Sequence, residues 1–198
     1  MSYDHKIIDQ KYHLKSLINK DVCNKLIKFY EDHQHMATPE DSYKYNNNLD
    51  DNKYEVDNCS FLNISKLRNE KDFDEPYNII LKYLRIVLVN YEMYIRNNLC
   101  PTYQNTFMTN TDNIRIIKYG VGKFIKDHSD VGDNIRGSLT INLNEDYEGG
   151  EFRFFGGLEK VSLSTGEAML FPGEPLWIHG TEPVTKGARY TINCFLRQ

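Results

Sequence analysis

The second half of the chain is divided into short segments in which apolar and polar residues alternate. Alternation with a period of two is typical of β-strands, and the Gly, Asn, Asp and Pro residues between the segments are typical of turns. The predicted strands span 113–119, 138–143, 151–155, 159–162, 167–171, 176–179 and 189–196. Seven short strands with turns between them favour a double-stranded β-helix, the jelly roll, within the α+β class.

Two helices are expected in the first half of the chain. One begins near Asp21, the expected N-cap, and runs to about His33. The other spans 75–97, with Asp74 as the expected cap and Pro76 in the first turn, where a missing N–H costs nothing. The apolar stripe of the second helix comprises Tyr77, Ile80, Leu81, Leu84, Leu88, Tyr91 and Ile95. We expect both helices to pack on one sheet of the jelly roll.

The segment 38–57 shows no sustained period and reads as a long loop. In a small enzyme such a loop is either a substrate lid or a surface insertion without a role. A strand is expected over 55–62. With 198 residues, the chain is predicted to form a single domain over 1–198, in which 1–112 give helical support and 113–198 form the jelly-roll core.

Charge and composition exclude several classes of function. The net charge of -4 and the pI near 5.9 give no basic field for nucleic acid. No apolar run reaches the length of a membrane span, and the first residues lack a signal-peptide core, so a soluble cytoplasmic protein is expected. The four cysteines lack paired spacing and are expected to be free thiols.

Two histidines and an aspartate form a candidate metal centre. His128 and Asp130 are second neighbours, so on a strand their side chains point to the same face. His179, on a distant strand, can complete a set of two imidazoles and one carboxylate, which is the usual ligand set of non-haem Fe(II) oxygenases. The alternatives are a surface pair in a turn for His128 and Asp130, and a core histidine for His179.

Arg189 lies on the last predicted strand, ten residues after His179. A guanidinium inside a jelly roll is costly unless a carboxylate pairs with it, and its planar fork can hold a carboxylate through two hydrogen bonds. The alternative is a surface arginine on an edge strand. Arg189 is therefore a candidate anchor for a carboxylate ligand.

From Asn113 to its last residue, the chain carries a series of landmarks in a fixed order. They are Tyr119-Gly120, His128-Ser129-Asp130, Leu143-Asn144, Gly149-Gly150-Glu151-Phe152, His179 and Arg189-Tyr190. This order resembles that of the Fe(II)/2-oxoglutarate-dependent dioxygenases, and within them the prolyl hydroxylase branch. The first hundred residues match this family much more loosely.

The resemblance implies a cofactor set and a reaction. Fe(II) would be held by His128, Asp130 and His179, with Arg189 binding the distal carboxylate of 2-oxoglutarate. O2 would be the oxidant, and ascorbate is a candidate addition. The implied reaction is hydroxylation of an unactivated C–H bond with release of succinate and CO2. Asp130 favours hydroxylation, since the related halogenases lack this carboxylate.

Four further residues are candidate co-substrate contacts. Tyr119 stands where the resemblance places a tyrosine that lines the co-substrate pocket; its alternative is an ordinary core tyrosine. Strand alternation puts Thr140 and Asn142 on one face and the neighbouring leucines and isoleucine on the other. Several relatives carry a carboxylate-binding tyrosine at the position of Asn142, so this contact departs from the family pattern. Asn193, on the face of Arg189, is a candidate for hydrogen bonding near the metal.

The resemblance implies a prolyl residue in a peptide or protein as the substrate. The loop 38–57, Trp177 and the segment 124–133 are candidates to frame such a peptide. A hydroxylase for a small molecule or free amino acid is the first alternative, and a non-catalytic jelly-roll binding module is another. A nucleic-acid demethylase is disfavoured, because that branch expects a second arginine where this chain has Phe195.

Overall fold

The computed structural model describes residues 7–39, 59–106, 108–111, 113–132 and 134–198. The helices are α1 (Lys20–Asp32), α2 (Ile64–Leu67) and α3 (Asp74–Asn98), and the 3-10 turns are η1 (Ile7–Gln10), η2 (Gln34–Met36) and η3 (Phe155–Gly157). The strands are β1 (Tyr12–Leu14), β2 (Thr38–Pro39), β3 (Ser60–Asn63), β4 (Arg115–Tyr119), β5 (Ile135–Asn142), β6 (Glu148–Gly149), β7 (Phe152–Phe154), β8 (Glu159–Val161), β9 (Ala168–Pro172), β10 (His179–Thr181), β11 (Val184–Lys186) and β12 (Arg189–Arg197).

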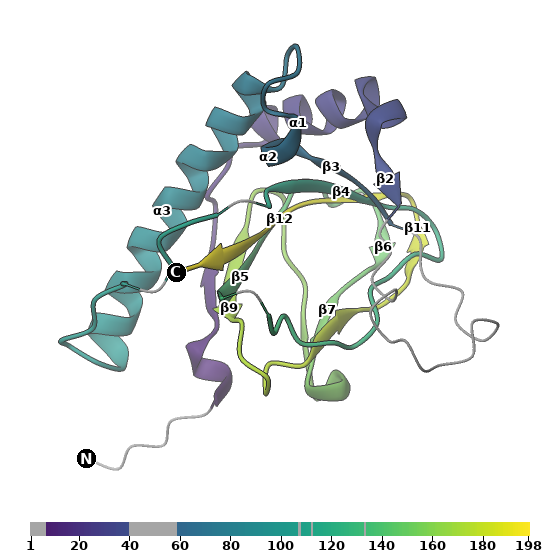
Figure 1. Ribbon diagram of the computed structural model, residues 1–198. Coiled ribbons are helices and arrows are strands. Elements are labelled where there is room, and N and C mark those ends of the chain that lie inside the picture. The colour runs from purple at the N-terminus through teal and green to yellow at the C-terminus, as the bar shows by residue number, and fades with distance from the viewer. Residues whose placement is uncertain (1–6, 40–58, 107, 112, 133) are drawn as a thin grey trace.

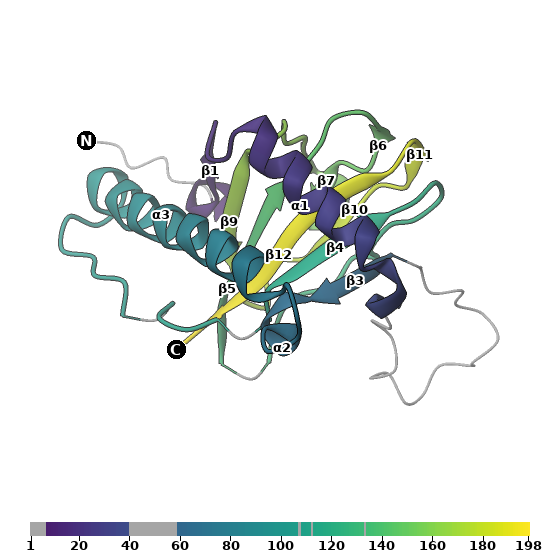
Figure 2. The ribbon, with the colours of Figure 1, turned by 90° about the horizontal axis from the view of Figure 1, so that it is seen from above.

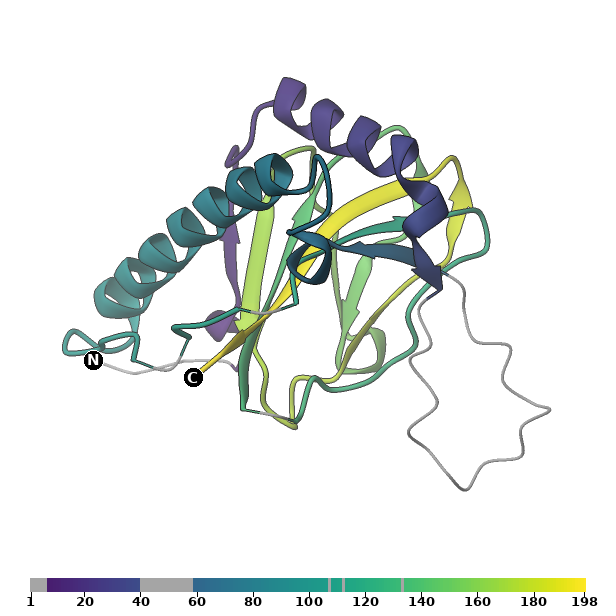
Figure 3. The ribbon, with the colours of Figure 1, turned by 45° about the horizontal axis from the view of Figure 1, so that its top comes forward.

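The strands form a jelly roll with one large and two small sheets. The larger sheet has seven strands in the order β1-β9-β5-β12-β4-β3-β2, and the smaller sheets are β10-β7-β8 and β11-β6. In Figure 1, β7 lies across the interior of the barrel from β4 and β12, and β6 and β11 lie at one side of it. The helices lie on the outer side of the larger sheet, where α1 and α3 run across its strands (Figures 2 and 3). The predicted α+β double-stranded β-helix, with helices packed on one sheet, is confirmed.

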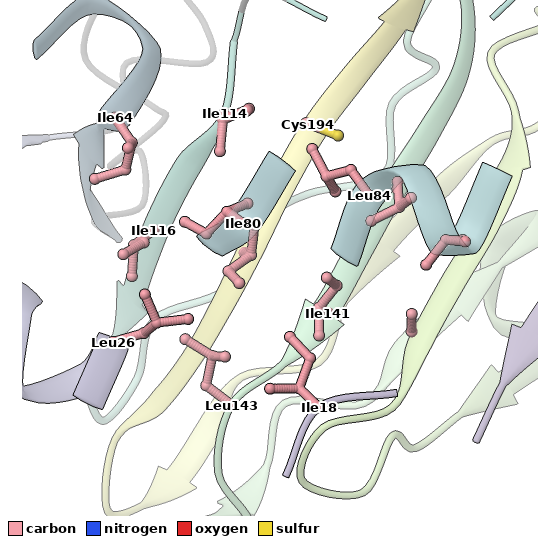
Figure 4. Packing of buried hydrophobic residues seen from close by; sticks show 14 of the residues in the cluster. Ile18, Leu26, Ile64, Ile80, Leu84, Ile114, Ile116, Ile141, Leu143 and Cys194 are labelled. Atoms are coloured by element: carbon pink, nitrogen blue, oxygen red, sulfur yellow. The ribbon is translucent and has the colours of Figure 1, made fainter. Parts of the chain in front are cut away.

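Each central strand of the larger sheet has one face toward the helices and one toward the barrel interior. On β5, Leu139 and Ile141 are buried in the cluster beneath the helices, as the alternation predicts. Figure 4 shows Ile141 of β5 in this cluster with Ile80 and Leu84 of α3. The opposite face of β5 therefore remains available for a site inside the barrel.

The two long helices form where predicted, but their N-caps differ from those expected. Asn19, not Asp21, caps α1, because its side chain accepts a hydrogen bond from the backbone N–H of Val22. Asp74 is already inside the first turn of α3, and its predecessor Phe73 makes no side-chain cap. An acidic residue in a first turn still stabilises the helix, since it faces the positive end of the helix dipole.

Helix α1 is tied to the larger sheet by a polar contact at Glu31. The carboxylate of Glu31 accepts hydrogen bonds from the Tyr190 hydroxyl at 2.7 Å and from the Lys118 ammonium at 2.9 Å. Burial alone would raise the pKa of Glu31, but these two hydrogen bonds and the charge of Lys118 outweigh it, so the pKa is lowered. The ionised form of Glu31 is therefore the one that holds the helix.

One predicted strand is displaced, and several short elements were missed. Residues 176–178 are not a strand, because Pro175 lies in a turn closed by the Trp177 N–H to Glu174 carbonyl bond of 2.9 Å; the strand β10 begins only at His179. Trp177 is 2% exposed and packs against aromatic residues of the barrel, so its expected role beside a substrate peptide is wrong. The strands β6 and β11 have two and three residues and give no sequence signal.

Other predictions have mixed outcomes. The strand expected over 55–62 occurs as β3, which spans Ser60–Asn63, and the predicted loop 38–57 lies almost wholly outside the described residues. In the part of the chain that the structure describes, Cys23, Cys59, Cys100 and Cys194 form no disulfide bond. Within the described ranges, no helix combines the length and the apolar character that crossing a membrane requires.

Candidate metal centre and co-substrate pocket

Three side chains from separate parts of the chain converge inside the barrel. Each of His128, Asp130 and His179 offers one ligand atom, and these atoms lie within 4.8 Å of one another. The Nε2 atoms of His128 and His179 lie 3.2 Å and 3.3 Å from the two carboxylate oxygens of Asp130. The three residues expected from the sequence thus form a compact group that could hold a metal ion.

The backbone fixes the two histidines opposite each other. His128 and His179 form an isolated antiparallel bridge, in which each N–H donates to the other's carbonyl, at 2.9 Å and 2.8 Å. A strand was expected around His128, but the structure has only this single bridge. Gly180 allows the close approach, because a Cβ at this position would lie 2.7 Å from the Ile125 carbonyl oxygen. Backbone pairing therefore sets the separation of the two imidazoles.

Hydrogen bonds orient both imidazole rings toward Asp130. The Nδ1 atom of His128 lies 2.8 Å from the Lys126 carbonyl oxygen, and that of His179 lies 2.9 Å from the Trp177 carbonyl oxygen. A carbonyl can only accept, so both Nδ1 atoms carry the proton and both Nε2 atoms present a lone pair when neutral. This tautomer is the one in which Nε2 can ligate a metal.

Asp130 is buried and supported by a neighbouring strand. The hydroxyl of Ser138, on β5, donates a hydrogen bond to one carboxylate oxygen of Asp130. Burial would raise the pKa of Asp130, but the imidazoles of His128 and His179 beside it outweigh this effect and hold the pKa well below its usual range. The carboxylate is therefore ionised and anionic, as a ligand to a divalent cation requires.

A cavity of about 260 Å³ opens beside these three residues. Tyr119 of β4, Thr140 of β5 and Asn193 of β12 line it, so three of the expected co-substrate contacts face the candidate metal centre. The Oδ1 of Asn193 accepts hydrogen bonds from the Thr140 hydroxyl at 3.2 Å and the Thr191 hydroxyl at 2.7 Å. These contacts fix the Asn193 amide at the wall of the cavity.

Arg189 packs against two of the aromatic rings that line this cavity. Its guanidinium carbon is 5.2 Å from the centre of the Tyr119 ring and 4.8 Å from that of the Phe152 ring. Arg189 is 2% exposed, and its Nη1 has no hydrogen-bond partner among the described residues. A surface arginine is thus excluded, and a buried donor remains for an anionic ligand.

Asn142 and Tyr147 complete the surroundings of Arg189. The Oδ1 of Asn142 accepts hydrogen bonds from Arg189 Nε and from the Tyr147 hydroxyl, both at 3.3 Å. Gly150, one of the sequence landmarks, lies against the arginine, since a Cβ there would be 3.1 Å from Arg189 Cδ. Tyr147 was not among the predicted site residues, because it follows β5 in a connection without any motif that points to Arg189.

The donor groups fit a ferrous ion and a dicarboxylic acid. Two neutral imidazoles and a carboxylate on one side of an ion form the facial set typical of non-haem Fe(II) oxygenases. The Nη1 atom of Arg189, which has no partner among the described residues, is a suitable donor for a carboxylate. A buried donor without an acceptor destabilises the protein, and a bound carboxylate would supply the missing acceptor. Tyr119 and Phe152 contact both features, because they line the cavity beside the three candidate ligands and their rings pack against the Arg189 guanidinium.

Fold and site together define a jelly-roll protein with a candidate centre for a divalent metal. The sequence profile of the 2OG-Fe(II) oxygenase superfamily matches residues 114–197. This segment contains β4 to β12 and all three converging side chains. Residues 114–197 therefore resemble the 2OG-Fe(II) oxygenase superfamily, in agreement with the sequence landmarks.

Sequence relatives agree with this assignment over a short segment. A PKHD-type hydroxylase from Pseudomonas fluorescens is 42% identical over 62 residues, which are 30% of this chain and 26% of the relative. The PKHD-type hydroxylase PiuC from Pseudomonas aeruginosa is 40% identical over 62 residues, with the same coverage. The match therefore spans about a quarter of the length of these relatives.

Solved structures resemble the fold over almost the whole chain. A prolyl hydroxylase from Trichoplax adhaerens, in complex with a hypoxia inducible factor peptide fragment, has a TM-score of 0.67 at 13% identity, covering 96% of this chain and 84% of that one. The viral collagen prolyl hydroxylase of Paramecium Bursaria Chlorella virus-1, as a 2OG complex, has a TM-score of 0.62 at 14% identity, with coverage of 98% and 97%. At these identities the likeness establishes the jelly-roll fold.

Proposed function

We propose that this protein is an Fe(II)- and 2-oxoglutarate-dependent dioxygenase that hydroxylates an unactivated C–H bond, with a prolyl residue in a peptide or protein as its substrate. The observation that carries the proposal is the convergence of His128, Asp130 and His179, with both histidine Nδ1 atoms tied to carbonyl oxygens. We further propose that residues 1–198 act as one domain, in which 113–198 carry the catalysis and 1–112 support it.

In this proposal each site residue has one role. His128, Asp130 and His179 hold the iron, and Arg189 binds the distal carboxylate of 2-oxoglutarate. The cavity-lining residues Tyr119, Thr140 and Asn193 contact the co-substrate and exclude water. Asn142 acts on the co-substrate through Arg189, because its Nδ2 already donates to the carbonyl oxygens of Asn144 and Leu163, at 2.6 Å and 2.7 Å.

The chain's contribution to the reaction is binding and orientation. When bound, iron and 2-oxoglutarate together supply the oxidation by O2 that hydroxylates a C–H bond and yields succinate and CO2. The bridge between His128 and His179 keeps both Nε2 atoms on one side of Asp130, and Ser138 keeps the carboxylate turned toward them. Phe152 and Phe171 give the cavity apolar walls, which reduce the contact of a bound co-substrate with water.

The fold of the prolyl hydroxylases supports a peptide as the substrate, since neighbours of this fold include one in complex with a peptide fragment. The exposed apolar residues Val131 and Ile178 directly follow Asp130 and precede His179, at 57% and 44% exposure. Apolar side chains beside the metal ligands suit an uncharged residue such as proline. Hydroxylation of a free amino acid or another small molecule is the second candidate, supported by the modest size of the cavity, about 260 Å³.

The proposal is tested by incubating the protein with Fe(II), 2-oxoglutarate, ascorbate and a panel of proline-containing peptides. Mass spectrometry should detect the gain of one oxygen atom, with one succinate formed for each hydroxylated residue. The same peptides with alanine in place of proline should remain unmodified. Modification of free amino acids with untouched peptides would favour the second candidate. Absence of any 2-oxoglutarate turnover across the panel would contradict the proposed cofactor requirement.

A pair of histidine variants ties the activity to the site. His179→Ala should abolish both iron binding and succinate formation, because it removes one of three ligands. The matched control is His35→Ala, which changes an exposed histidine on η2 and should leave both unchanged. Succinate formation by His179→Ala at the wild-type rate would eliminate the proposed ligand set.

A further inference from the structure

A cavity of about 350 Å³ lies between helix α3 and the ends of strands β5 and β9. Its lining residues are Tyr91, Tyr103, Met108, Arg136, Pro172 and Glu174, and none of them lines the cavity beside the candidate metal ligands. We propose that this cavity, the exosite, binds an acidic side chain of the substrate peptide that lies a few residues away from the hydroxylated residue. The inference rests on the proposed function and deepens it, because it adds a requirement on the peptide sequence.

The charges of the exosite favour an anionic group. Arg136 is half-buried and forms no ion pair or side-chain hydrogen bond with another described residue, Glu174 included. Glu174 is exposed, so solvent screens its charge more strongly than it screens the charge of Arg136. A guanidinium in this position can bind a carboxylate through strong, bidentate hydrogen bonds.

Two tyrosines add donors and an apolar wall. Tyr91 of α3 is 4% exposed, and its hydroxyl has no hydrogen-bond partner among the described residues. Burial raises the pKa of Tyr91 and of Tyr103, so both hydroxyls keep their proton and can donate to a carboxylate. Met108 and Pro172 give apolar surface for the aliphatic part of an acidic side chain. The exosite thus combines one cation with two neutral donors.

Two short stretches of chain connect the exosite with the candidate metal centre. Arg136 is the second residue before Ser138 on β5, so their Cα atoms are about 7 Å apart. The hydroxyl of Ser138 in turn donates to Asp130. Glu174 is the fifth residue before His179, which places their Cα atoms at most about 18 Å apart. An extended peptide of about five or six residues spans such a distance.

Exposed apolar side chains lie along the second of these stretches. Between Glu174 and His179, Leu176 is 69% exposed and Ile178 is 44% exposed, whereas Trp177 between them is buried. Two neighbouring apolar side chains in solvent, with the exosite before them and a candidate metal ligand after them, are suited to contact a bound chain. The peptide should therefore carry uncharged residues between its proline and its acidic residue.

The test compares peptides that contain one proline and differ at a single other position. This position holds Asp, Asn or Lys, and it is moved up to about eight residues from the proline on either side. Mass spectrometry of the hydroxylated peptide gives kcat/KM for each. At the best spacing, expected within about six residues, kcat/KM for the Asp peptide should exceed that for the Asn peptide by about tenfold, the effect of one hydrogen bond to a charged group.

Two variants of Arg136 and one control assign this preference to the exosite. Arg136→Gln should remove the advantage of the Asp peptide, and Arg136→Glu should give the advantage to the Lys peptide instead. A variant that has lost its fold cannot gain activity toward a new peptide, so the charge reversal separates binding from stability. The control is Arg85→Gln, which changes an exposed arginine of α3 outside the exosite and should keep the Asp preference.

The outcomes separate this inference from the proposed function. Equal kcat/KM of the wild type for the Asp, Asn and Lys peptides at every spacing would overturn the exosite, while the hydroxylation itself would still support the proposed function. An Asp preference that persists in Arg136→Gln would also overturn the exosite. If the wild type hydroxylated none of the peptides, the proposed peptide substrate and the exosite would both be overturned.

Discussion

Replacing Arg189 with methionine should separate the stability of the free protein from its response to 2-oxoglutarate. The side chain is 2% exposed and Nη1 has no partner among the described residues, so its burial is costly. Apolar replacement of buried ionic groups is often neutral or stabilising by about 1–4 kcal/mol. The lost contacts with the Tyr119 and Phe152 rings offset about 0.5–2 kcal/mol of this. We expect the unfolding free energy of the metal-loaded, ligand-free variant to stay within about 2 kcal/mol of the wild type.

The response to the co-substrate should change much more. At one hundred times its Kd, 2-oxoglutarate should stabilise the wild-type protein by about 2.7 kcal/mol. Loss of one hydrogen bond to a charged group weakens binding by about 1.5–3 kcal/mol. At the same concentration, the increase in unfolding free energy that 2-oxoglutarate gives to Arg189→Met should therefore be only about 0.3–1.3 kcal/mol.

Urea unfolding of the Fe(II)-loaded proteins without O2, with and without 2-oxoglutarate, measures both quantities. The control is Arg153→Met, which changes a partly exposed arginine of β7 that pairs with Asp127 at 2.8 Å. 2-Oxoglutarate should stabilise this variant as strongly as it stabilises the wild type. An Arg189→Met variant that 2-oxoglutarate stabilises as strongly as the wild type would refute the assignment of Arg189.

Three further predictions concern the metal ligand, the core and the helix anchor. Ser138→Ala should weaken iron binding about 10–100-fold, as loss of a hydrogen bond to a ligand does, measured by metal titration; an unchanged affinity would contradict the support of Asp130. Leu84→Ala, at a buried position of α3, should lower the unfolding free energy by about 2–5 kcal/mol. Val89→Ala, at a position of the same helix that is 61% exposed, should change the unfolding free energy by no more than about 0.5 kcal/mol. Folding lowers the pKa of Glu31 below its ordinary value of 4.5. The ionised carboxylate therefore stabilises the folded protein fully above pH 4.5, and this contribution is lost as the pH falls through the lowered pKa. Acid titration of stability should therefore be shallower in Glu31→Gln, and an identical profile would exclude this contribution.

The candidate metal centre could be predicted from the sequence because it depends on a few residues with a recognisable spacing. His128 and Asp130 are two residues apart, and the spacing of His179 and Arg189 fits the family order. The exact backbone around them could not be predicted. Pro175 and the hydrogen bond from the Trp177 N–H to the Glu174 carbonyl turn the chain just before His179. The strand β10 therefore begins at His179, where the sequence predicted a strand that ends there.

The support of Arg189 was beyond sequence analysis for a different reason. Asn142 was expected as a direct contact to the co-substrate, but its amide hydrogens bind the carbonyl oxygens of Asn144 and Leu163. Leu163 is distant in the chain, and its position depends on how the two walls of the barrel come together. The same holds for Tyr147, which reaches Asn142 only because the chain reverses after β5. Contacts of this kind follow from tertiary packing and leave no periodic signal.

Strand β5 contributes to two unlike environments through neighbouring residues. Leu139 and Ile141 hold the helices, while Ser138, Thr140 and Asn142 face the candidate site. Deleting one residue early in β5 would exchange the two sets, since a slip of one position turns every later side chain to the opposite side. The packing of the helices on the sheet and the candidate site would then be lost together. This strand can therefore accept substitutions but not changes of length.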